Sequence, residues 1–309
     1  MPKIILDCDP GLDDAVALLL AHGNPDVEVL AVTTVGGNAP LAQVTRNARL
    51  VADMAAMKGV PIAAGADRPL VTALQTSAHV HGDSGLGGVE PGEPASPLDP
   101  RHAVDVIVET VMAHPPGEVT LVPVGPLTNI AAAVRREPAI VERVAEVVLM
   151  GGAVGAGNCT AVAEFNVACD PEAAHIVVDA GWPVTMVGLD LTHQALASDE
   201  VLARVEAVGG RVSEFVLEMV RFYRESYRRN RGFAAPPLHD PCAVAYVIDR
   251  AVMTTRRAPI AVELTGTHTR GMTVVDLRHE AGEDCPTQVG VTLDVDRFWD
   301  LVLDALTRL

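Results

Sequence analysis

Short apolar runs rich in β-branched residues alternate along this chain with stretches of helical pattern. The strand-like runs are residues 3–6, 27–35, 119–125, 146–150 and 183–189. The helix-like stretches include residues 13–23, 41–59 and 127–137. This alternation is typical of a parallel sheet that is covered by helices on both faces. We therefore predict an α/β fold with a mainly parallel, open, Rossmann-like central sheet.

The pattern changes after residue 197, where longer helices are expected. Residues 211–231 form the most polar and aromatic of these helical stretches. Three strand-like runs follow at 258–266, 272–278 and 288–295, and we expect some antiparallel pairing among them before a last helix at 296–309. Since no low-complexity linker divides the chain, we expect a single domain over residues 1–309.

The sequence is acidic, with 40 Asp and Glu against 23 Lys and Arg and a formal net charge of −17. It has no run of Lys or Arg to follow a phosphate backbone, which argues against nucleic-acid binding. It also has no stretch of 18 apolar residues and no signal-peptide pattern at its start, so no membrane association is expected. Five scattered cysteines, never spaced C-x-x-C, favour reduced thiols. These features together predict a cytoplasmic protein.

Four aspartates crowd the end of the first predicted strand in the sequence DCDPGLDD: Asp7, Asp9, Asp13 and Asp14. Two unit charges about 4 Å apart repel by roughly 4 kcal/mol at an effective dielectric of about 20, so either the side chains diverge or a cation lies among them. Asp7 and Asp9 are expected on one face of the strand. A Pro-Gly pair then leads into a helix that begins near Asp13. Asp13 and Asp14 therefore also fit structural roles, as N-cap and first-turn residue.

The spacing of these aspartates excludes one common cation site and leaves another open. An EF-hand loop starting at Asp7 would need glycine where Leu12 stands and a closing glutamate where Leu18 stands. A D-x-D phosphotransfer motif, with an aspartate nucleophile and Mg²⁺, stays open, although it favours Thr or Val where Gly11 stands. The all-oxygen donor set indicates a hard ion, either Ca²⁺ or Mg²⁺.

Further polar groups follow other predicted strands, where open α/β sheets bind ligands. They lie in GGN at 36–38, VPVGPLTN at 122–129, MGGAVGAGN at 150–158 and LDLTH at 189–193. Far downstream, His239 and Asp240 precede a predicted helix. Asp240 with Pro241 also fits an ordinary helix start, as N-cap and first helical residue, so both roles stay open for it.

Several motifs, taken together and in order, resemble the nucleoside hydrolase family, in particular its inosine-uridine-preferring branch. They are DCDPGLDDAVALLLA, TTVGGN, VPVGPLTNIA, VLMGG, AEFN with DPEAAHIV, and HDPCAVAYVI, which together span almost the whole chain. The resemblance implies hydrolysis of the N-glycosidic bond of ribonucleosides such as inosine and uridine, in nucleoside salvage or catabolism, with bound Ca²⁺. It implies calcium ligands at Asp9, Asp14, Asp240 and the main-chain carbonyl of Val124. Asp9 would also be the general base, with Asp7 behind the ligands.

The resemblance also implies how the ribose is held. Its contacts fall on Asp13, Asn38, Met150, Asn158, Glu164 and Asn166. Carboxylates accept hydrogen bonds from hydroxyls, and amides both donate and accept. Glu164 and Asn166 would share a face if the sequence EFN is extended. Asn158 equally fits a turn residue, and Met150 equally fits the core.

On the base side, His239 resembles the family's proton donor to the departing base, a role that suits a histidine near neutral pH. Tyr223 and Tyr227, four residues apart on one helix face, are candidates to contact the base, and they fit a core stripe equally well. His81 is a further candidate on this side. Because the family is usually homodimeric or homotetrameric, we also expect a homo-oligomer.

Overall fold

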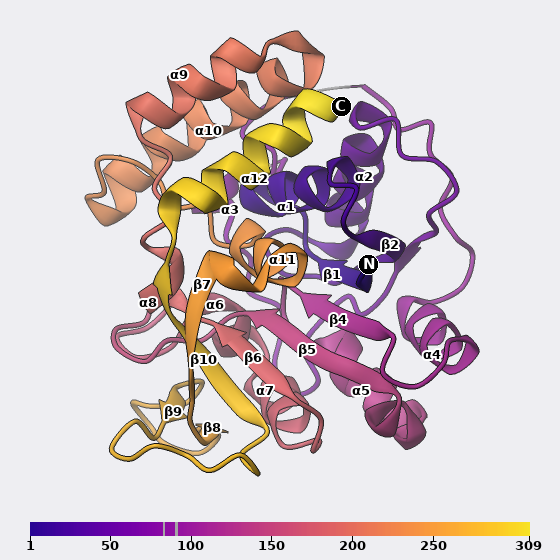
Figure 1. The fold of residues 1–309 in the computed structure, drawn as a ribbon, viewed down its shortest axis with the longest axis vertical. Helices are drawn as coiled ribbons and strands as arrows, with labels where there is room; N and C mark the ends of the chain where they lie inside the picture. The colour runs from indigo at the N-terminus through magenta and orange to yellow at the C-terminus, as the bar shows by residue number, and fades with distance from the viewer. Residues whose placement is uncertain (83, 90–91) are drawn as a thin grey trace.

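An eight-stranded sheet runs through the molecule in the computed structural model, in the order β3-β2-β1-β4-β5-β6-β10-β7 (Figure 1). The structure describes residues 1–82, 84–89 and 92–309, apart from the side chains of residues 230 and 231. The strands of this sheet are β1 (Lys3–Cys8), β2 (Glu28–Thr34), β3 (Ile62–Ala64), β4 (Val119–Pro123), β5 (Val144–Met150), β6 (Val184–Val187), β7 (Met253–Arg257) and β10 (Thr287–Leu293).

Neighbouring strands from β3 to β10 are parallel, and β7 pairs antiparallel with β10 at the edge. A small second sheet of β8 (Ile260–Val262) and β9 (Thr273–Val275) is also antiparallel. The predicted mainly parallel sheet, with antiparallel strands near the C-terminus, is confirmed. Strand β7 was not predicted, because its sequence MTTRR is polar and largely exposed at the sheet edge.

Helices cover both faces of the sheet, each set packed on its own hydrophobic cluster. Those on one face are α1 (Leu12–Gly23), α2 (Leu41–Met54), α9 (Asp199–Val208), α10 (Gly210–Arg231), α11 (Pro241–Ile248) and α12 (Val295–Arg308). Those on the other face are α4 (Ala103–Ala113), α5 (Thr128–Arg136) and α7 (Pro171–Val178). The connections hold α3 (Ala78–His81), α6 (Phe165–Cys169) and α8 (Leu189–Thr192). Helices on both faces were predicted and are confirmed.

Strand β1 shows how the two faces divide. Ile4 and Leu6 join one hydrophobic cluster and Ile5 the other, as the two-residue period of a strand requires. Asp7 follows Ile5 in this alternation, and its carboxylate accepts a hydrogen bond from a side chain of α5 on the same face. Since β1 ends at Cys8, Asp9 lies beyond the strand. The expectation that Asp7 and Asp9 share one strand face is therefore wrong.

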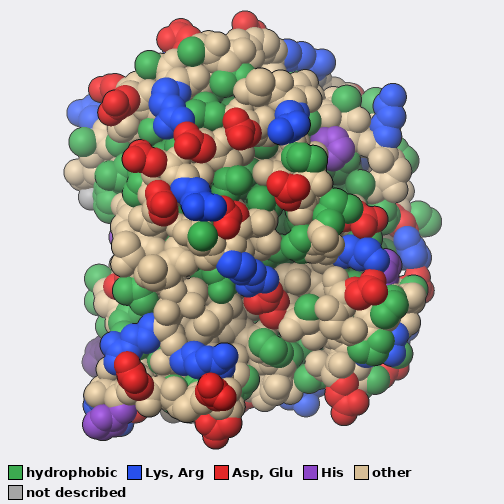
Figure 2. Space-filling view, in the orientation of Figure 1, with side chains coloured by type: hydrophobic (Ala, Val, Ile, Leu, Met, Phe, Trp, Pro, Cys, Tyr) green, Lys and Arg blue, Asp and Glu red, His purple; other side chains and the backbone are tan. Residues whose placement is uncertain are grey.

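The surface is mixed in charge. Lys and Arg side chains are interspersed with Asp and Glu over the face shown in Figure 2. Within the described part of the chain, no helix combines the length and the apolar character that crossing a membrane requires.

Candidate active site

Segments that follow the carboxyl ends of parallel strands surround an open cavity. Asn38 comes after β2, Val124 directly after β4, and Met150 ends β5. The cavity is lined by Asp13, Asn38, Gln75, Thr76, Ser77, His79, Val80, His81, Val124, Met150, Asn158, Cys159, Glu164, Phe165, Asn166, Tyr223, Tyr227, His239 and Asp240. Every predicted site residue lines it except Asp9 and Asp14, which are fully buried beside Asn38.

Asp14 caps the start of α1. Gly11 is the N-cap residue, and the Asp14 carboxylate accepts hydrogen bonds from the N–H groups of Gly11 (2.9 Å) and Asp9 (3.0 Å). Carboxylate oxygens of Asp13, Asp14 and Asp240 all lie within 4.8 Å of one another. Asp14 thus has a structural role and also belongs to a carboxylate cluster, whereas Asp13 is not the N-cap.

Asp9 is held in a narrow, fully buried position. Its Oδ2 accepts a hydrogen bond from the N–H of Asn38 at 2.6 Å, while Oδ1 has no hydrogen-bond partner within the described residues. A methyl group on Gly37 would overlap Oδ2, and one on Gly125 would lie 2.5 Å from Oδ1. A buried carboxylate oxygen without a partner costs free energy, so this atom is a candidate ligand for a cation.

Asp240 is the N-cap residue of α11, but its side chain makes no capping hydrogen bond. Burial raises the pKa of Asp240 well above its usual range, and the charges of Asp13 and Asp14 raise it further. Burial and the charge of Asp14 likewise raise the pKa of Asp9, and they raise the pKa of Asp13 to about 7. These carboxylates fit a hard divalent cation such as Ca²⁺, whose charge would compensate theirs.

Glu164 and Asn166 lie at the start of a helix. The condition of an extended EFN segment is not met, because Glu164 is the N-cap of α6 and its carboxylate accepts hydrogen bonds from three backbone N–H groups, including that of Asn166 (2.9 Å). The side-chain amide of Asn166 donates to the carbonyl oxygens of Val124 (2.8 Å) and Met150 (3.1 Å). Asn166 therefore fixes the main-chain carbonyl that was predicted as a calcium ligand.

Two further asparagines organise the cavity wall. The Oδ1 of Asn158 accepts a hydrogen bond from the N–H of Phe165 (2.8 Å), in keeping with a turn-forming role. The Nδ2 of Asn38 donates to Asp14 (3.1 Å), and its Oδ1 accepts a hydrogen bond from Ser77 (2.6 Å). Asn38 thus connects the buried carboxylates with the segment that leads into α3.

A chain of hydrogen bonds joins α8 to α10 through His239. The Nδ1 of His239 lies 2.7 Å from Oγ1 of Thr192, and its Nε2 lies 2.7 Å from the hydroxyl of Tyr227. The hydroxyl of Tyr223 lies 3.5 Å from that of Tyr227 and donates to Asp13 at 3.4 Å. The two tyrosine rings pack edge to face with centroids 4.7 Å apart. Both tyrosines belong to the hydrophobic cluster and also line the cavity. They therefore pack in the core and are also placed where they can contact a ligand.

His81 reaches the cavity from α3. Its Nδ1 accepts a hydrogen bond from the N–H of Leu12 (3.1 Å), so the imidazole binds the first turn of α1. Burial lowers the pKa of His81 to about 3, which keeps the ring neutral at physiological pH. The ring centroid lies 5.5 Å from that of Tyr223. His81 therefore presents a neutral ring beside the tyrosines.

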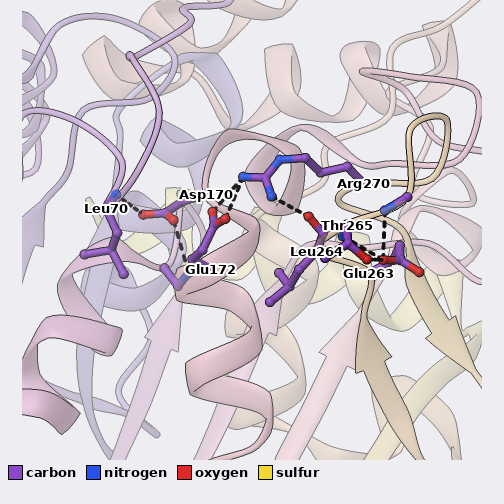
Figure 3. A network of polar contacts seen from close by, with 9 residues as sticks. Leu70, Asp170, Glu172, Glu263, Leu264, Thr265 and Arg270 are labelled. Carbon is purple, nitrogen blue, oxygen red and sulfur yellow. Dashed lines mark hydrogen bonds and ion pairs between the residues drawn. The ribbon is translucent and has the colours of Figure 1, made fainter.

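Asp170 is fully buried outside the cavity and connects segments around it. Its carboxylate accepts hydrogen bonds from the hydroxyl of Thr128 (2.7 Å), the N–H of Leu70 (2.9 Å) and an N–H of α7 (3.1 Å). Nearby, both carboxylate oxygens of Glu172 lie 2.8 Å from the guanidinium of Arg270 (Figure 3). Asp170 thereby ties α5, α7 and the segment before α3 together.

We expect Asp170→Ala to lower the free energy of unfolding by about 2–4 kcal/mol, because three donors, two of them buried, lose their acceptor. Urea unfolding followed by circular dichroism measures this loss. Glu172→Ala is the matched control, with an expected loss of about 1 kcal/mol or less because its ion pair is partly exposed. Equal losses in the two variants would contradict the assigned role of Asp170.

Sequence reasoning missed several lining residues: Gln75, Thr76, Ser77, His79, Val80, Cys159 and Phe165. Cys159 directly follows Asn158, Phe165 directly follows Glu164, and the other five lie within six residues of His81. It also missed Thr192 as a partner of His239, although the LDLTH motif was noted.

A family model described as "Inosine-uridine preferring nucleoside hydrolase" matches residues 4–300. The chain belongs to this family. It is 61% identical to the inosine-uridine preferring nucleoside hydrolase of Crithidia fasciculata, over 100% of this chain and 99% of the relative. It is 58% identical to the protein of the same name from Leishmania major, over 99% of this chain and 98% of the relative. The solved purine-preferring ribonucleoside hydrolase from Gardnerella vaginalis matches this nucleoside hydrolase with a TM-score of 0.93 and 34% identity, covering 99% and 98% of the two chains.

Membership in the nucleoside hydrolase family confirms the predicted family and the predicted class of enzyme, a ribonucleoside hydrolase. The fold agrees as well, since the related structure is superposable along almost the whole chain. Because the chain belongs to the nucleoside hydrolase family, the alternative that the opening aspartates form a D-x-D phosphotransfer motif is dropped.

Proposed function

We propose that this nucleoside hydrolase cleaves the N-glycosidic bond of ribonucleosides in a calcium-dependent reaction that releases free base and ribose. Its proposed substrates are inosine, uridine and other purine and pyrimidine ribonucleosides. One observation carries the proposal: a single cavity brings a buried carboxylate cluster together with a hydrogen-bonded His–Tyr pair. Such a site can accept a proton from water and donate one to a leaving group.

The proposed calcium ligands are Asp9, Asp14, Asp240 and the main-chain carbonyl of Val124. Support comes from the unpartnered Oδ1 of Asp9 and from the raised pKa values of these buried carboxyl groups. It also comes from Asn166, which fixes the Val124 carbonyl. When bound, the ion would supply positive charge that compensates the carboxylates and polarises nearby water.

Asp9 is proposed as the general base and His239 as the source of the proton for the leaving base. Asp9 takes a proton from a water molecule as the water oxygen bonds to C1′ of the ribose. The C1′–N bond breaks, its electron pair moves to the base nitrogen, and the His239–Tyr227 pair donates a proton there. Return of the proton from Asp9 to His239 through solvent restores the enzyme, with one water consumed for each bond broken. Asp7, which accepts the Val124 N–H on its carbonyl (2.8 Å), is proposed as a positioning residue.

The ribose is proposed to bind among the cavity residues Asp13, Asn38, Met150, Asn158, Glu164 and Asn166. In the hydrogen bonds described above, Asn158 uses its Oδ1 and Asn166 uses its Nδ2. The Nδ2 of Asn158 and the Oδ1 of Asn166 are therefore the groups proposed to donate to and accept from ribose hydroxyls. The carboxylate of Asp13 is proposed to accept from a further hydroxyl.

The base is proposed to lie beside His81, Tyr223 and Tyr227. These three rings line the cavity together with His239. An aromatic wall tolerates both one-ring and two-ring bases, because each base has an apolar face for contact. The names of the relatives, which pair inosine with uridine or describe a purine preference, also support a range that includes both base classes.

The setting of the reaction is proposed from the sequence features and the family resemblance. We propose that the chain acts as one domain, within a homotetramer or homodimer in the cytoplasm, and serves nucleoside salvage or catabolism. Light scattering of the purified protein measures the number of chains, and a monomer at working concentration would contradict the proposed oligomer.

The function is tested with a panel of inosine, uridine, cytidine, adenosine and guanosine and their 2′-deoxy forms, assayed for free reducing sugar. We expect release of ribose from purine and pyrimidine members. The 2′-deoxy forms should lose about 100-fold or more in kcat/KM, because hydroxyl contacts that strengthen in the transition state are missing. No sugar release from any ribonucleoside would contradict the proposed function, and equal rates on the deoxy forms would contradict the hydroxyl contacts.

A further inference from the structure

Helix α8 contacts the segment that precedes Asn158 and also the cavity residue His239. From this helix, the carboxylate of Asp190 accepts hydrogen bonds from the N–H groups of Val154 (2.6 Å) and Gly155 (3.1 Å), in the segment that leads to Asn158. Two residues later, Thr192 is fully buried, and its Oγ1 lies 2.7 Å from Nδ1 of His239. The LDLTH motif that follows β6 therefore supports the cavity, although α8 contributes no residue to its lining.

The contact between Thr192 and His239 bears on which nitrogen of the imidazole carries the proton. A neutral imidazole carries a proton on one nitrogen and accepts a hydrogen bond on the other. In the proposed mechanism the proton for the leaving base is on Nε2, the nitrogen that contacts Tyr227, and Nδ1 then accepts a hydrogen bond. The hydroxyl of Thr192 is a donor at the correct distance for this arrangement. A hydroxyl also accepts, so the same contact persists if Nδ1 becomes protonated.

Tyr227, the second hydrogen-bond partner of the His239 ring, is also buried. Tyr227 is 6% exposed and His239 is 5% exposed, so the imidazole is enclosed between a hydroxyl of α8 and a hydroxyl of α10. Aromatic neighbours add to this enclosure, since the ring of His193 lies 5.6 Å from that of His239, edge to face. The ring is packed in place, and the hydroxyl of Thr192 is positioned to donate to Nδ1 when the proton is on Nε2.

We propose that Thr192 is the positioning residue for His239, which orients the imidazole and holds it in the tautomer that has its proton on Nε2. This proposal rests on the proposed function of His239 as the source of the proton for the leaving base. Thr192 itself lies outside the cavity and is not proposed to touch substrate.

The test compares Thr192→Val with Thr192→Ser on two substrates. Valine keeps the shape of threonine and removes the hydroxyl, whereas serine keeps the hydroxyl. With inosine, we expect kcat of Thr192→Val to fall roughly 10- to 100-fold with KM changed less than about threefold, because the proton donor is lost from its productive state while the ribose contacts stay. Thr192→Ser should retain most of the wild-type kcat.

With 4-nitrophenyl β-D-ribofuranoside, whose leaving group departs without protonation, Thr192→Val should keep kcat within about threefold of the wild type. Equal losses on both substrates, or a loss in Thr192→Ser as large as in Thr192→Val, would overturn the proposal. If the wild type releases no ribose from either substrate, the proposed function fails instead, so the two failures are distinguishable.

A spectroscopic measurement keeps the proposal testable if Thr192→Val does not fold. In the wild type labelled with ¹⁵N-histidine, the His239 signals are assigned by their absence in His239→Gln. We expect the shift of an unprotonated nitrogen at Nδ1 and that of a protonated nitrogen at Nε2 in the neutral ring. The opposite tautomer would overturn the proposal.

Discussion

Asp9→Asn is expected to lower kcat for inosine by about 10³- to 10⁴-fold, because the amide cannot take a proton from water and is a weaker ligand for a cation. The geometry makes this residue hard to replace, since Oδ1 is buried without a hydrogen-bond partner among the described residues and Oδ2 is held by Asn38. Ribose release from inosine at saturating substrate measures the loss. Circular dichroism and thermal unfolding show whether the variant remains folded.

Asp7→Asn is the matched control for this substitution. Asp7 is equally buried and lies two residues away, and its Oδ1 accepts hydrogen bonds from Thr33 (2.6 Å) and Asn129 (2.8 Å) that an asparagine oxygen can also accept. We expect its kcat to fall less than about 10-fold. If Asp9→Asn retained a tenth of the wild-type rate, or if the two variants lost activity equally, the role of Asp9 as base and ligand would be wrong.

Removal of calcium with EGTA is expected to abolish ribose release and to lower the thermal unfolding midpoint by roughly 5–10 °C. A ligand present at about 1,000 times its dissociation constant stabilises the folded state by about 4 kcal/mol, and each kcal/mol shifts the midpoint of a large domain by roughly 2 °C. The physical reason is the carboxylate cluster of Asp13, Asp14 and Asp240, whose mutual repulsion is uncompensated without the ion. Differential scanning fluorimetry and the ribose assay measure the two effects.

The identity of the ion is tested by adding back Ca²⁺ or Mg²⁺ separately to the EGTA-treated enzyme. We expect Ca²⁺ to restore both activity and the unfolding midpoint, and Mg²⁺ to restore much less, since Mg²⁺ requires a smaller and more regular octahedral shell. Asp240→Asn serves as the control because its midpoint should respond only weakly to Ca²⁺. Full recovery with Mg²⁺ alone would contradict the calcium proposal, and unchanged activity in EGTA would contradict metal dependence altogether.

The parts of this molecule that the sequence predicted are those encoded by local pattern. The alternation of strand-like and helix-like runs predicted the parallel sheet, because the apolar pattern of a strand or a helix can be recognised within about ten residues. The position of the cavity was predictable for a similar reason. Polar residues placed directly after strands meet at one edge of a parallel sheet, as Asn38 and Val124 do.

Other features depend on contacts between distant residues, and no local pattern encodes them. Thr192 and His239 are 47 residues apart, and Asp170 binds Leu70 across 100 residues. The N-cap role of Glu164 was not predicted, because its carboxylate accepts hydrogen bonds from backbone N–H groups that include that of Gly152, 12 residues away. Strand β7 was missed because an edge strand with few buried residues lacks the apolar alternation that marks an inner strand.

The two glycines that flank Asp9 bear on how this enzyme can be altered. Gly37 and Gly125 belong to segments that follow different strands, and neither tolerates even one additional carbon without displacing the Asp9 carboxylate. A mutant library aimed at new nucleoside analogues should therefore keep both positions constant. Variation is better placed at Gln75, Thr76 and His79, whose exposed side chains line the cavity. In this way substrate range can be diversified while the geometry of the carboxylates is preserved.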